Sequence, residues 1–361
     1  MTKARPARAA EAAPRTAKPA RALRTPGGLS LRLDVRAAVV TAGLFLLACA
    51  AGVLLIGSGD FDIAVTDVIK TLFGGGTTAQ EFIVNDLRLP RVLVGLLVGA
   101  ALGIAGAVFQ TVTRNPLGSP DMLGFSHGAT AGALCAIVLL HGGPMATAAG
   151  ALIGAVVTGI AVYTLAWKRG VHGYRLVLVG IGGSAVLVAI NGYLLTKAQI
   201  ADAARAVLWM TGSLNGRDWA QVWPLLAACA VLVPLTVGYG RQLRMLEMGD
   251  DTAYALGIRA ERVRLVTLVA ATLLVAVATA AAGPVAFVAL TAPQLARRLT
   301  KAPGPNLLPS ACMGAVILLV ADWASQRLFG ADQLPVGVLT GMLGGGYLLW
   351  LLAAERKAGR I

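Results

Sequence analysis

The sequence predicts an all-α integral membrane protein with about ten transmembrane helices and both termini in the cytoplasm. Hydrophobic residues make up 57% of the 361 positions and charged residues only 13%, whereas soluble domains carry about 25% charged residues. Charge-free windows of about 20 residues, the length that crosses a bilayer, recur along the chain. Lys and Arg gather in alternate connections between these windows, as they do in multi-pass membrane proteins.

The windows give the spans in order. Five of them are free of charge and long enough for one helix: 37–59, 92–113, 176–196, 219–240 and 333–354. The window 302–321 is similar, and it continues as an apolar segment beyond Asp322. The window 122–167 is twice too long and breaks at the residues His-Gly-Gly-Pro (141–144), so it predicts two spans.

The last window, 265–296, breaks at Gly283-Pro284 and fits either one span or two. If the Arg-rich N-terminal segment lies in the cytoplasm and this window is divided, 24 of the 31 Lys and Arg residues face the cytoplasm and 7 face outside. An undivided window would place the basic C-terminus outside, against the positive-inside bias. We therefore expect ten spans. The net charge of +14 is then a topology signal, and it gives no reason to expect a nucleic-acid partner.

Three regions follow from this reading. Residues 1–36 are rich in Ala, Pro and Arg without apolar periodicity, so we expect a disordered basic cytoplasmic tail. Residues 37–354 form the ten-helix domain, and residues 355–361 form a short cytoplasmic C-terminal tail.

The sequence offers no catalytic or metal-binding set. Its four cysteines are scattered singly through apolar spans, a spacing that supports neither a metal site nor a disulfide framework. It contains no G-x-x-x-x-G-K-[ST] loop, so the chain is not its own P-loop ATPase. HExxH and paired-carboxylate patterns are also missing, which disfavours an intramembrane enzyme. We expect a protein without enzyme activity.

The second span carries a glycine stripe and ends in a polar break. Glycines at 95, 99 and 103 let neighbouring helices approach closely, which predicts a helix at the centre of the bundle. The break that follows has two prolines within five residues, which forbids a continuous helix. Irregular backbone at this depth is tolerated only beside water or protein. We interpret Asn115, Pro116 and Leu117 as a cytoplasmic gate; an ordinary tight turn is the alternative.

The connection 241–264, RQLRMLEMGDDTAYALGIRAERVR, is the most charged stretch outside the tail. Gly249 and Gly257 bracket a short predicted helix over 250–256, with acidic residues in its first turn, where the helix dipole favours them. A second short helix is expected to begin near Ala260. Two short helices at a membrane surface suit docking into a groove on a soluble partner; a plain connecting loop is the alternative.

Four charged residues toward the outer face are candidate functional residues. Arg88 and Arg91 lie one helical turn apart and could present a joint positive patch to carboxylates, and Arg327 lies at the same face. Each alone is more often a snorkelling residue at the membrane interface. Asp322 lies within an apolar helix, where a carboxylate is costly and is a functional candidate by default. Because proton-coupled carriers usually need a chain of such groups, we expect Asp322 to be hydrogen-bonded or paired.

Several motifs carry a family resemblance, in this order: RLPR (88–91), the Gly-rich helix ending in Gln110, RNPLGSPDMLGF (114–125), the loop 246–257, GPVAFVALTAPQLARRL (283–299) and LPVGVLTG (334–341). Together they resemble the permease subunits of bacterial ATP-binding-cassette (ABC) importers for iron–siderophore complexes and vitamin B12. Within that family, NPLGSPDMLGF, WMTGSLNGRDW and APQLARRL are most similar to the ferric enterobactin permease subunits.

The resemblance implies a type II ABC importer architecture in the bacterial cytoplasmic membrane, with two ten-helix subunits around a central pathway. It implies that Arg88, Arg91 and Arg327 contact acidic residues of a binding protein, and that Asn115 and Leu117 lie at the cytoplasmic gate. It further implies that the connection 241–264 supplies coupling helices that enter the ATPase. The residues assigned to this coupling are Gly249, Asp250, Asp251, Ala253, Leu256 and Gly257.

The expected partners are a second permease subunit, two cytoplasmic ATPase subunits, an extracytoplasmic binding protein, a ferric siderophore and the lipid bilayer. The resemblance favours a different paralogue as the second permease and leaves an identical one open. No cofactor is expected on this chain, since ATP and Mg²⁺ are bound by the ATPase partner.

Two departures from the family pattern bear on the substrate. Many relatives carry Pro-His where this chain has Pro293-Gln294, and Gly-Ala-Pro where it has Gly-Gly-Gly (344–346). They make vitamin B12 a poorer guess than a siderophore, and the resemblance to the enterobactin permease subunits favours a catecholate, enterobactin-like one. A vitamin B12 or haem permease of the same fold, and a proton-coupled secondary carrier that uses Asp322, are the alternatives.

Overall fold

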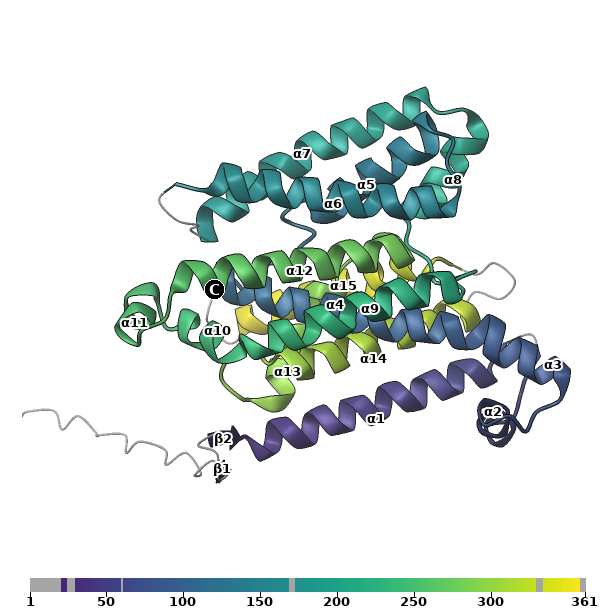
Figure 1. Ribbon diagram of the computed structural model, residues 1–361, viewed down its shortest axis with the longest axis horizontal. Helices are drawn as coiled ribbons and strands as arrows, with labels where there is room; N and C mark the ends of the chain where they lie inside the picture. Colours follow the sequence, from purple (N-terminus) through teal and green to yellow (C-terminus); the bar gives the residue numbers. More distant parts are fainter. Residues whose placement is uncertain (1–20, 25–29, 60, 169–172, 329–333, 358–361) are drawn as a thin grey trace, which may run out of the picture.

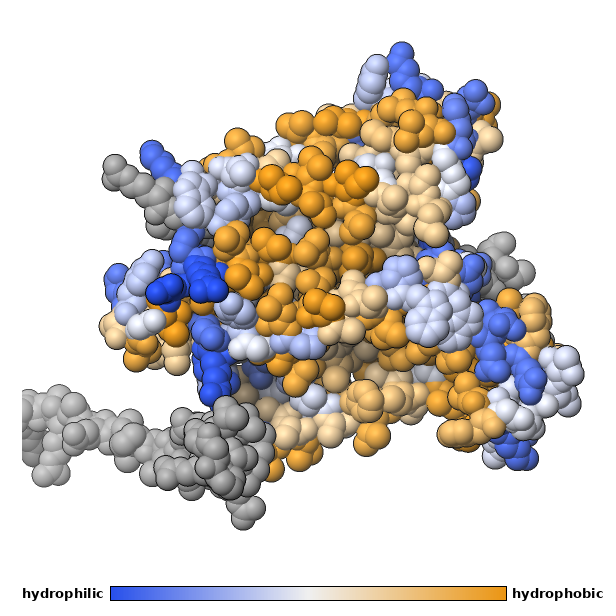
Figure 2. Space-filling model, viewed as in Figure 1, coloured by the Kyte–Doolittle hydropathy of each residue, from blue (hydrophilic) through white to orange (hydrophobic). Residues whose placement is uncertain are grey.

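The computed structural model describes residues 21–24, 30–59, 61–168, 173–328 and 334–357. Its long helices run roughly along one direction (Figure 1). Apolar side chains form a broad band across the middle of the molecule, and hydrophilic side chains gather at its two ends (Figure 2). Within the described ranges, seven helices are long and apolar enough to cross a membrane. The chain therefore has the build of a multi-pass membrane protein, as the composition predicted.

The membrane-directed helices fall on the ten predicted windows. The long ones are α1 (Val35–Gly57), α4 (Leu89–Thr113), α6 (Pro144–Ala166), α7 (Gly173–Lys197), α9 (Trp219–Gly238), α12 (Ala260–Ala282) and α14 (Leu307–Arg327). Three others complete the set: α5 (Phe125–Leu134) with its π-helical continuation η2 (Cys135–Leu139), α13 (Val288–Thr300) and α15 (Val336–Lys357).

Shorter helices lie at the two ends of this bundle (Figure 1). One end carries α2 (Val65–Leu72), α3 (Thr78–Glu81), the π-helix η1 (Phe82–Arg88) and α8 (Ile200–Met210). The opposite end carries α10 (Gly240–Glu247) and α11 (Asp250–Ala255).

The start of α1 and the last turns of α15 lie at the same end as α10 and α11. The Nε of Arg36, in α1, donates a hydrogen bond to the Leu299 carbonyl at 2.9 Å. The guanidinium of Arg298 lies 5.1 Å from the ring centre of Trp350, in α15. This end carries the predicted cytoplasmic basic residues, so the structure agrees with both termini on the cytoplasmic side.

The glycine stripe places α4 at the centre of the bundle, where it packs against α14, α12, α13 and α9. A Cβ added at Gly103 would lie 2.1 Å from the carbonyl oxygen of Ser310, and one at Gly99 would lie 2.5 Å from that of Gly314. Since real Cβ atoms do not approach so closely, the two backbones touch only because these positions are glycine. The prediction of a central helix is confirmed.

The third span is irregular over its cytoplasmic half. Thr113, which ends α4, lies against Gly173, the first residue of α7, whereas Gly124 lies against Ser184. These two contacts lie eleven positions apart on α7, which is about 16 Å of helix. The segment 114–124 therefore runs as irregular backbone from the cytoplasmic end toward the middle of the bundle, where α5 begins.

The eighth span is irregular over its outer half. Helix α12 ends at Gly283, whose φ of 75° suits glycine, and α13 begins only after Phe287, whose φ is 65°. Gly337 approaches the carbonyl of Pro284, and Gly344 approaches the side chain of Phe287. The predicted division at Gly283-Pro284 is confirmed. However, α13 has only 13 residues, about 20 Å, and is too short to cross a bilayer by itself.

The prediction of a second short helix starting near Ala260 is wrong. Ala260 begins α12, which continues without a break through 23 residues to Ala282. No Gly or Pro interrupts this stretch, so nothing ends the helix near the membrane surface. The second short helix is instead α10, on the N-terminal side of α11.

Parts of the predicted tails have regular structure. Residues 1–20 and 25–29 lie outside the described residues, but β1 (Arg21–Arg24) pairs antiparallel with β2 (Ser30–Leu33). A lone two-stranded hairpin is marginally stable in water, so this pair does not make a domain. Helix α1 begins at Val35, where the Asp34 side chain caps its first backbone N–H groups. At the other end of the chain, α15 extends to Lys357, and residues 358–361 lie outside the described residues.

Candidate functional site

The outer end of the bundle contains a polar pocket of about 560 Å³. The three predicted docking arginines line it together, although they lie on different parts of the chain. Its charged lining residues are Arg88, Arg91, Arg217, Arg327, Asp86 and Asp218. Two further aspartates, Asp322 and Asp62, pair with Arg91 and Arg327, so the four arginines around this pocket face four carboxylates.

Within this pocket, Arg91 binds Asp322. The Arg91 Nε donates to Oδ2 of Asp322 at 3.0 Å and the Nη2 donates to Oδ1 at 2.8 Å. The amide of Gln326 donates a third hydrogen bond to Oδ2 at 2.9 Å. The Asp322 side chain is only 1% exposed, so its charge requires such partners. The expectation of a paired Asp322 is confirmed, and Arg91 has a structural task besides any contact with a partner.

The other two predicted arginines have different surroundings. Arg88 donates from Nη1 to the carbonyl of Ile56 and from Nη2 to that of Phe61, both at 2.7 Å, so it ties the end of α1 to the outer loop. Arg327 donates to Asp62 at 3.0 Å, and both of these side chains are substantially exposed, 43% and 76%. Arg327 is therefore the most accessible of the three.

Arg217 is a pocket residue that sequence reasoning did not select. It lies in the connection between α8 and α9, and its Nε donates to the carbonyl of Ser213 at 3.1 Å. Burial lowers the pKa of Arg217 from its ordinary value, and the neighbouring Asp218 opposes this shift. An arginine stays charged at neutral pH even so. The available signal in the sequence was its position in the motif WMTGSLNGRDW.

At the cytoplasmic end, the predicted gate segment is held by α13, which in turn contacts α15. The side-chain oxygen of Asn115 accepts from the backbone N–H of Leu117 at 2.9 Å, which forms a local turn. The amide of Gln294, on α13, donates to the carbonyl of Pro116 at 2.9 Å. The hydroxyl of Tyr347, on α15, donates in turn to Gln294 at 3.3 Å. The gate role of Asn115, Pro116 and Leu117 stays a prediction.

Asp121 joins the two irregular spans deep in the bundle. The hydroxyl of Ser126, in the first turn of α5, donates to Oδ1 of Asp121 at 2.5 Å. The carboxylate also accepts a backbone hydrogen bond from Phe287, just before α13, and faces His127. One carboxylate thus holds the beginnings of both half-length helices. Sequence reasoning treated Asp121 only as part of the proline-rich turn, because its partner Phe287 is remote in the sequence.

The predicted coupling loop consists of α10 and α11 joined by a turn. Gly249 has a φ of 113° and Gly257 a φ of 77°, so the two glycines bracket α11 as predicted. Ala253 is buried against the bundle, whereas Met248, Tyr254 and Leu256 are more than half exposed. Large apolar side chains exposed at a charged, cytoplasmic end suit a groove on a soluble partner.

The coupling loop is tied to the bundle through Asp250. Arg264, in α12, and Arg114, at the end of α4, each donate to its Oδ1 at 2.5 Å. The hydrogen bond from Arg264 is the main cause that holds the pKa of Asp250 below its ordinary value, and Arg114 lowers it further. Asp251, the next residue, is exposed.

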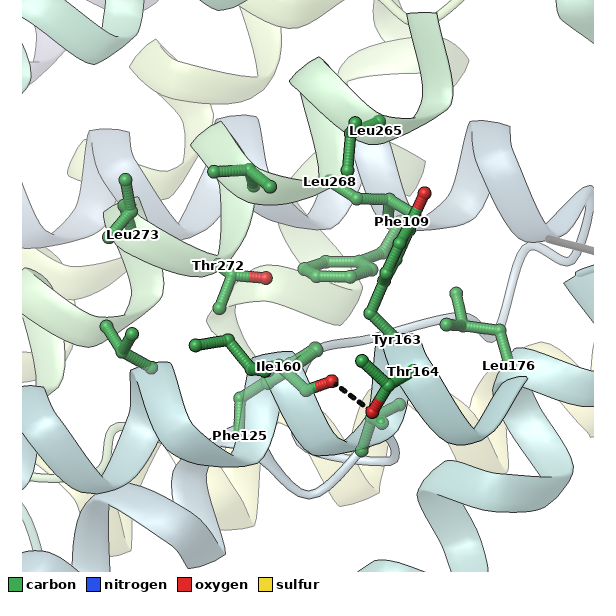
Figure 3. A pocket seen from close by; sticks show the side chains of 14 residues that line it. Phe109, Phe125, Ile160, Tyr163, Thr164, Leu176, Leu265, Leu268, Thr272 and Leu273 are labelled. Atoms are coloured by element: carbon green, nitrogen blue, oxygen red, sulfur yellow. Dashed lines mark hydrogen bonds between the residues drawn. The ribbon is translucent and has the colours of Figure 1, made fainter. Parts of the chain in front are cut away.

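An apolar cavity of about 210 Å³ lies between α6 and α12 (Figure 3). The rings of Phe109 and Phe125 lie side by side in it, with their centres 5.3 Å apart. The hydroxyl of Thr164, one of the few polar groups in this cavity, donates a hydrogen bond to the carbonyl of Ile160. Ile160 and Val269 at its edge are about half exposed in the apolar band. Such a lining fits hydrocarbon and does not fit a charged iron chelate.

Comparisons with known proteins give consistent matches over most of the chain. Residues 44–354 match the FecCD transport family. The ferric enterobactin transport system permease protein FepG of Escherichia coli is 45% identical over 330 residues, which cover 89% of this chain and 98% of the relative. The iron(3+)-hydroxamate import system permease protein FhuG of Bacillus subtilis is 35% identical over 323 residues, 87% of this chain and 96% of the relative.

The fold is also known from a solved structure. A metal-chelate type ABC transporter in an inward-facing conformation superposes with a TM-score of 0.77. The two chains are 24% identical, and the match covers 88% of this chain and 99% of that one. At this identity the likeness concerns the fold, and it agrees with the predicted architecture.

Proposed function

The chain belongs to the FecCD transport family, and we propose that it is the permease subunit of an ABC importer that moves a ferric siderophore into the cytoplasm. The 45% identity to a ferric enterobactin permease, over nearly its whole length, carries this proposal and favours a catecholate, enterobactin-like substrate. The chain is a multi-pass membrane protein of a transport family, and the bacterial cytoplasmic membrane is its location.

The outer pocket supports docking of a binding protein. In the proposed cycle, a binding protein loaded with a ferric siderophore presents acidic residues to Arg88, Arg91 and Arg327. Complementary charge speeds such an encounter and fixes its orientation more than it adds affinity. Arg327 is the most exposed of these residues, so it is the first contact we expect.

The cytoplasmic end supports coupling to a separate ATPase. Helices α10 and α11 present the exposed side chains of Met248, Tyr254 and Leu256, and we propose that they enter grooves on two ATPase subunits. ATP and Mg²⁺ bind those subunits, and this chain contributes no cofactor site and breaks no bond. Closure of the ATPases would then move the gate segment around Asn115, Pro116 and Leu117.

A second permease subunit completes the proposed pathway. The similarity to enterobactin systems favours a different paralogue over a second copy of this chain. The cavity between α6 and α12 is apolar and does not fit a charged iron chelate. We therefore propose that the substrate passes between the two subunits.

A proton-coupled carrier that uses Asp322 is the less favoured function. Arg91 and Gln326 donate three hydrogen bonds to this carboxylate, and it is nearly inaccessible to water. A proton-carrying group must lose and regain its partners in each cycle, whereas this one is held like a structural ion pair.

Uptake of radioactive iron, presented as several purified ferric siderophores, tests the proposed function in cells. We expect cells that lack this subunit, and cells with Gly257→Asp, to lose uptake of one siderophore class. The control is Gly74→Asp, because Gly74 has a similar φ, 83° against 77°, and open space around it, but lies at the outer end.

Unchanged uptake of every siderophore would overturn the substrate assignment and point to vitamin B12 or haem. Normal uptake with Gly257→Asp would show that the coupling loop is wrongly assigned. Loss with both variants would show only that an acidic residue at a positive φ disrupts folding, so membrane levels of the subunit are measured in parallel.

A further inference from the structure

Arg114 holds both sides of the turn that joins α10 to α11. Its Nε donates to the carbonyl of Leu246, in α10, at 3.1 Å. Its Nη2 donates to Oδ1 of Asp250, the first residue of α11, at 2.5 Å. A single guanidinium therefore fixes both short helices of the coupling loop to the end of α4, a geometry that the planar fork of arginine allows and a lysine ammonium does not.

The same carboxylate connects the loop to α12. Arg264 donates from Nη2 to Oδ1 of Asp250 at 2.5 Å and contacts Glu261 at 3.5 Å. The Arg264 side chain is only 8% exposed, so it forms the fixed side of this bridge. Arg114 is 43% exposed and lies on the side of the gate. Asp250 thus binds two cations: the buried Arg264 on α12 and the more exposed Arg114, which directly precedes the gate segment.

The chain has little slack between Arg114 and the gate segment. Arg114 caps the C-terminus of α4 in the left-handed region, with a φ of 51°, and only Asn115 separates it from Pro116. Consecutive Cα atoms are held about 3.8 Å apart, so a shift of Arg114 is passed to the next residues. The Pro116 carbonyl is held from the other side by Gln294. A displacement of α10 and α11 must therefore either pull the gate segment away from α13 or break the Arg114 contacts.

A second contact makes the end of α4 move with α10. The hydroxyl of Thr111 donates to Glu247, the last residue of α10, at 3.1 Å. The two contacts lie about one helical turn apart on α4 and bind α10 at neighbouring residues, Leu246 and Glu247. The coupling loop and the last turn of α4 are thereby linked at more than one point.

We propose that Arg114 is a positioning residue that transmits movement of the coupling loop to the cytoplasmic gate, through its contacts with Leu246 and Asp250. This inference rests on the proposed importer function, and it adds to it a residue outside the predicted gate and coupling sets. The link is mechanical: Arg114 touches neither substrate nor nucleotide, and its loss separates ATP hydrolysis from transport.

A purely stabilising ion pair makes a different prediction. Partly exposed pairs contribute little to folding, so Arg114→Ala is expected to leave the subunit folded and assembled. A stabilising role would lower the amount of transporter and reduce ATP hydrolysis and transport together. If Arg114 instead transmits movement, its loss changes the ratio of ATP hydrolysis to transport.

The test uses the complete transporter in proteoliposomes, supplied with loaded binding protein and ATP. The measured quantity is the number of ATP molecules hydrolysed per ferric siderophore delivered. For Arg114→Ala we expect this number to rise about tenfold, a usual size for coupling between two sites. Arg114→Lys is expected to lie between Arg114→Ala and the parent, because lysine keeps the charge but makes one contact in place of two.

Lys301→Ala is the matched control. Lys301 is also an exposed basic residue that ends a helix at the cytoplasmic end, α13, and has the same φ of 51°. We expect it to keep the parent ratio. A parent ratio in Arg114→Ala, or a ratio that rises equally in Lys301→Ala, would overturn the proposal. If the parent transporter itself shows no ATP-dependent uptake, the importer function has failed, before the variants are compared.

A second measurement follows the gate directly. A spin label on Leu117→Cys, in a subunit whose four native cysteines are replaced, reports movement of the gate segment when ATP binds. We expect the ATP-dependent change in the spectrum to disappear in Arg114→Gln while ATP binding persists. An equal ATP-dependent spectral change in the parent and in Arg114→Gln would contradict the proposal. This result would count even if Arg114→Ala could not be purified.

Discussion

The two ends of this molecule use arginine in different ways. At the outer end, Arg88, Arg91 and Arg327 line one pocket, but each binds its own partners: two carbonyls, Asp322 and Asp62. At the cytoplasmic end, Arg114 and Arg264 share a single carboxylate, Asp250. The outer arginines form separate contacts around a hollow, whereas the cytoplasmic ones join three elements into one network.

This difference fits the two proposed tasks, docking at the outer end and coupling at the cytoplasmic end. A docking surface must keep its shape and present charge to a partner that arrives and leaves, so independent contacts are sufficient. A coupling region must move several elements together, and contacts shared between those elements favour such joint movement. We infer that variants at the outer end will change either stability or docking, one residue at a time. Variants at the cytoplasmic end will change how events are coupled.

The largest effect on stability is expected at the outer end, from Asp322→Ala. This variant leaves the mostly buried guanidinium of Arg91 without its carboxylate, and breaking a buried ion pair costs about 3–5 kcal/mol. Thermal unfolding of the purified transporter measures the loss. The double variant Asp322→Ala with Arg91→Met is expected to recover part of it, because no unpaired charge remains. A single variant as stable as the parent would contradict a structural role for the pair.

A smaller loss is expected between the two ends, from Asp121→Ala. The change removes the acceptor of the Ser126 hydroxyl and of the Phe287 backbone N–H. Leaving a buried donor unsatisfied costs about 1–3 kcal/mol. Hydrogen exchange at the starts of α5 and α13 should increase together, since one carboxylate holds both. An increase confined to α5 would show that Asp121 does not join the two spans.

A docking effect without a stability effect is expected from Arg327→Ala. Arg327 and Asp62 are both exposed, and pairs of this kind contribute about 0–1 kcal/mol to folding. We expect an unchanged unfolding temperature but a slower association with the binding protein, measured at low and high salt. The difference from the parent should shrink as salt increases, because exposed charges are screened. A difference independent of salt would exclude a charge contact at this position.

The smallest effect concerns the pH dependence of the Asp250 bridge near neutrality. The pKa of Asp250 is lowered in the folded protein, from an ordinary value of 3.8. A depressed carboxylate pKa contributes stability that is fully present above the unfolded value and is lost as pH falls through the folded value.

We therefore expect the stability difference between the parent and Asp250→Asn to be constant from about pH 5 to pH 8 and to shrink below about pH 4. Unfolding temperatures of both proteins across this range measure the difference. A difference that already declines between pH 8 and pH 5 would mean that the folded pKa is raised, and that Arg264 and Arg114 do not bind the carboxylate.

Local patterns predicted most of the fold. The positions of the spans follow from charge-free length, the central place of α4 from glycines at every fourth position, and the limits of α11 from Gly249 and Gly257. Each of these signals acts within a few turns of helix, so the sequence displays it directly. The helix that begins at Ala260 was mistaken for a separate short helix, because its charged first turn resembles a surface helix until the apolar residues that follow are counted with it.

The site was predicted as a set of residues but not as a set of contacts. Arg91 and Asp322 were selected separately, for docking and as an intramembrane acid, yet they form one ion pair across 231 positions of sequence. The link from Arg114 to Asp250 and the link from Asp121 to Phe287 also join residues that are remote in the sequence. Only packing of the bundle brings such residues together. Burial of Arg217 beside the predicted arginines likewise depends on how the connection between α8 and α9 folds back.

The most direct test of this account is ferric siderophore accumulation in proteoliposomes that contain the complete transporter. Accumulation is measured with ATP and loaded binding protein, and separately with a proton gradient and no ATP. The account predicts accumulation that requires ATP and the binding protein and is indifferent to the gradient. Accumulation driven by the proton gradient alone, and lost in Asp322→Asn, would contradict it and establish a secondary carrier.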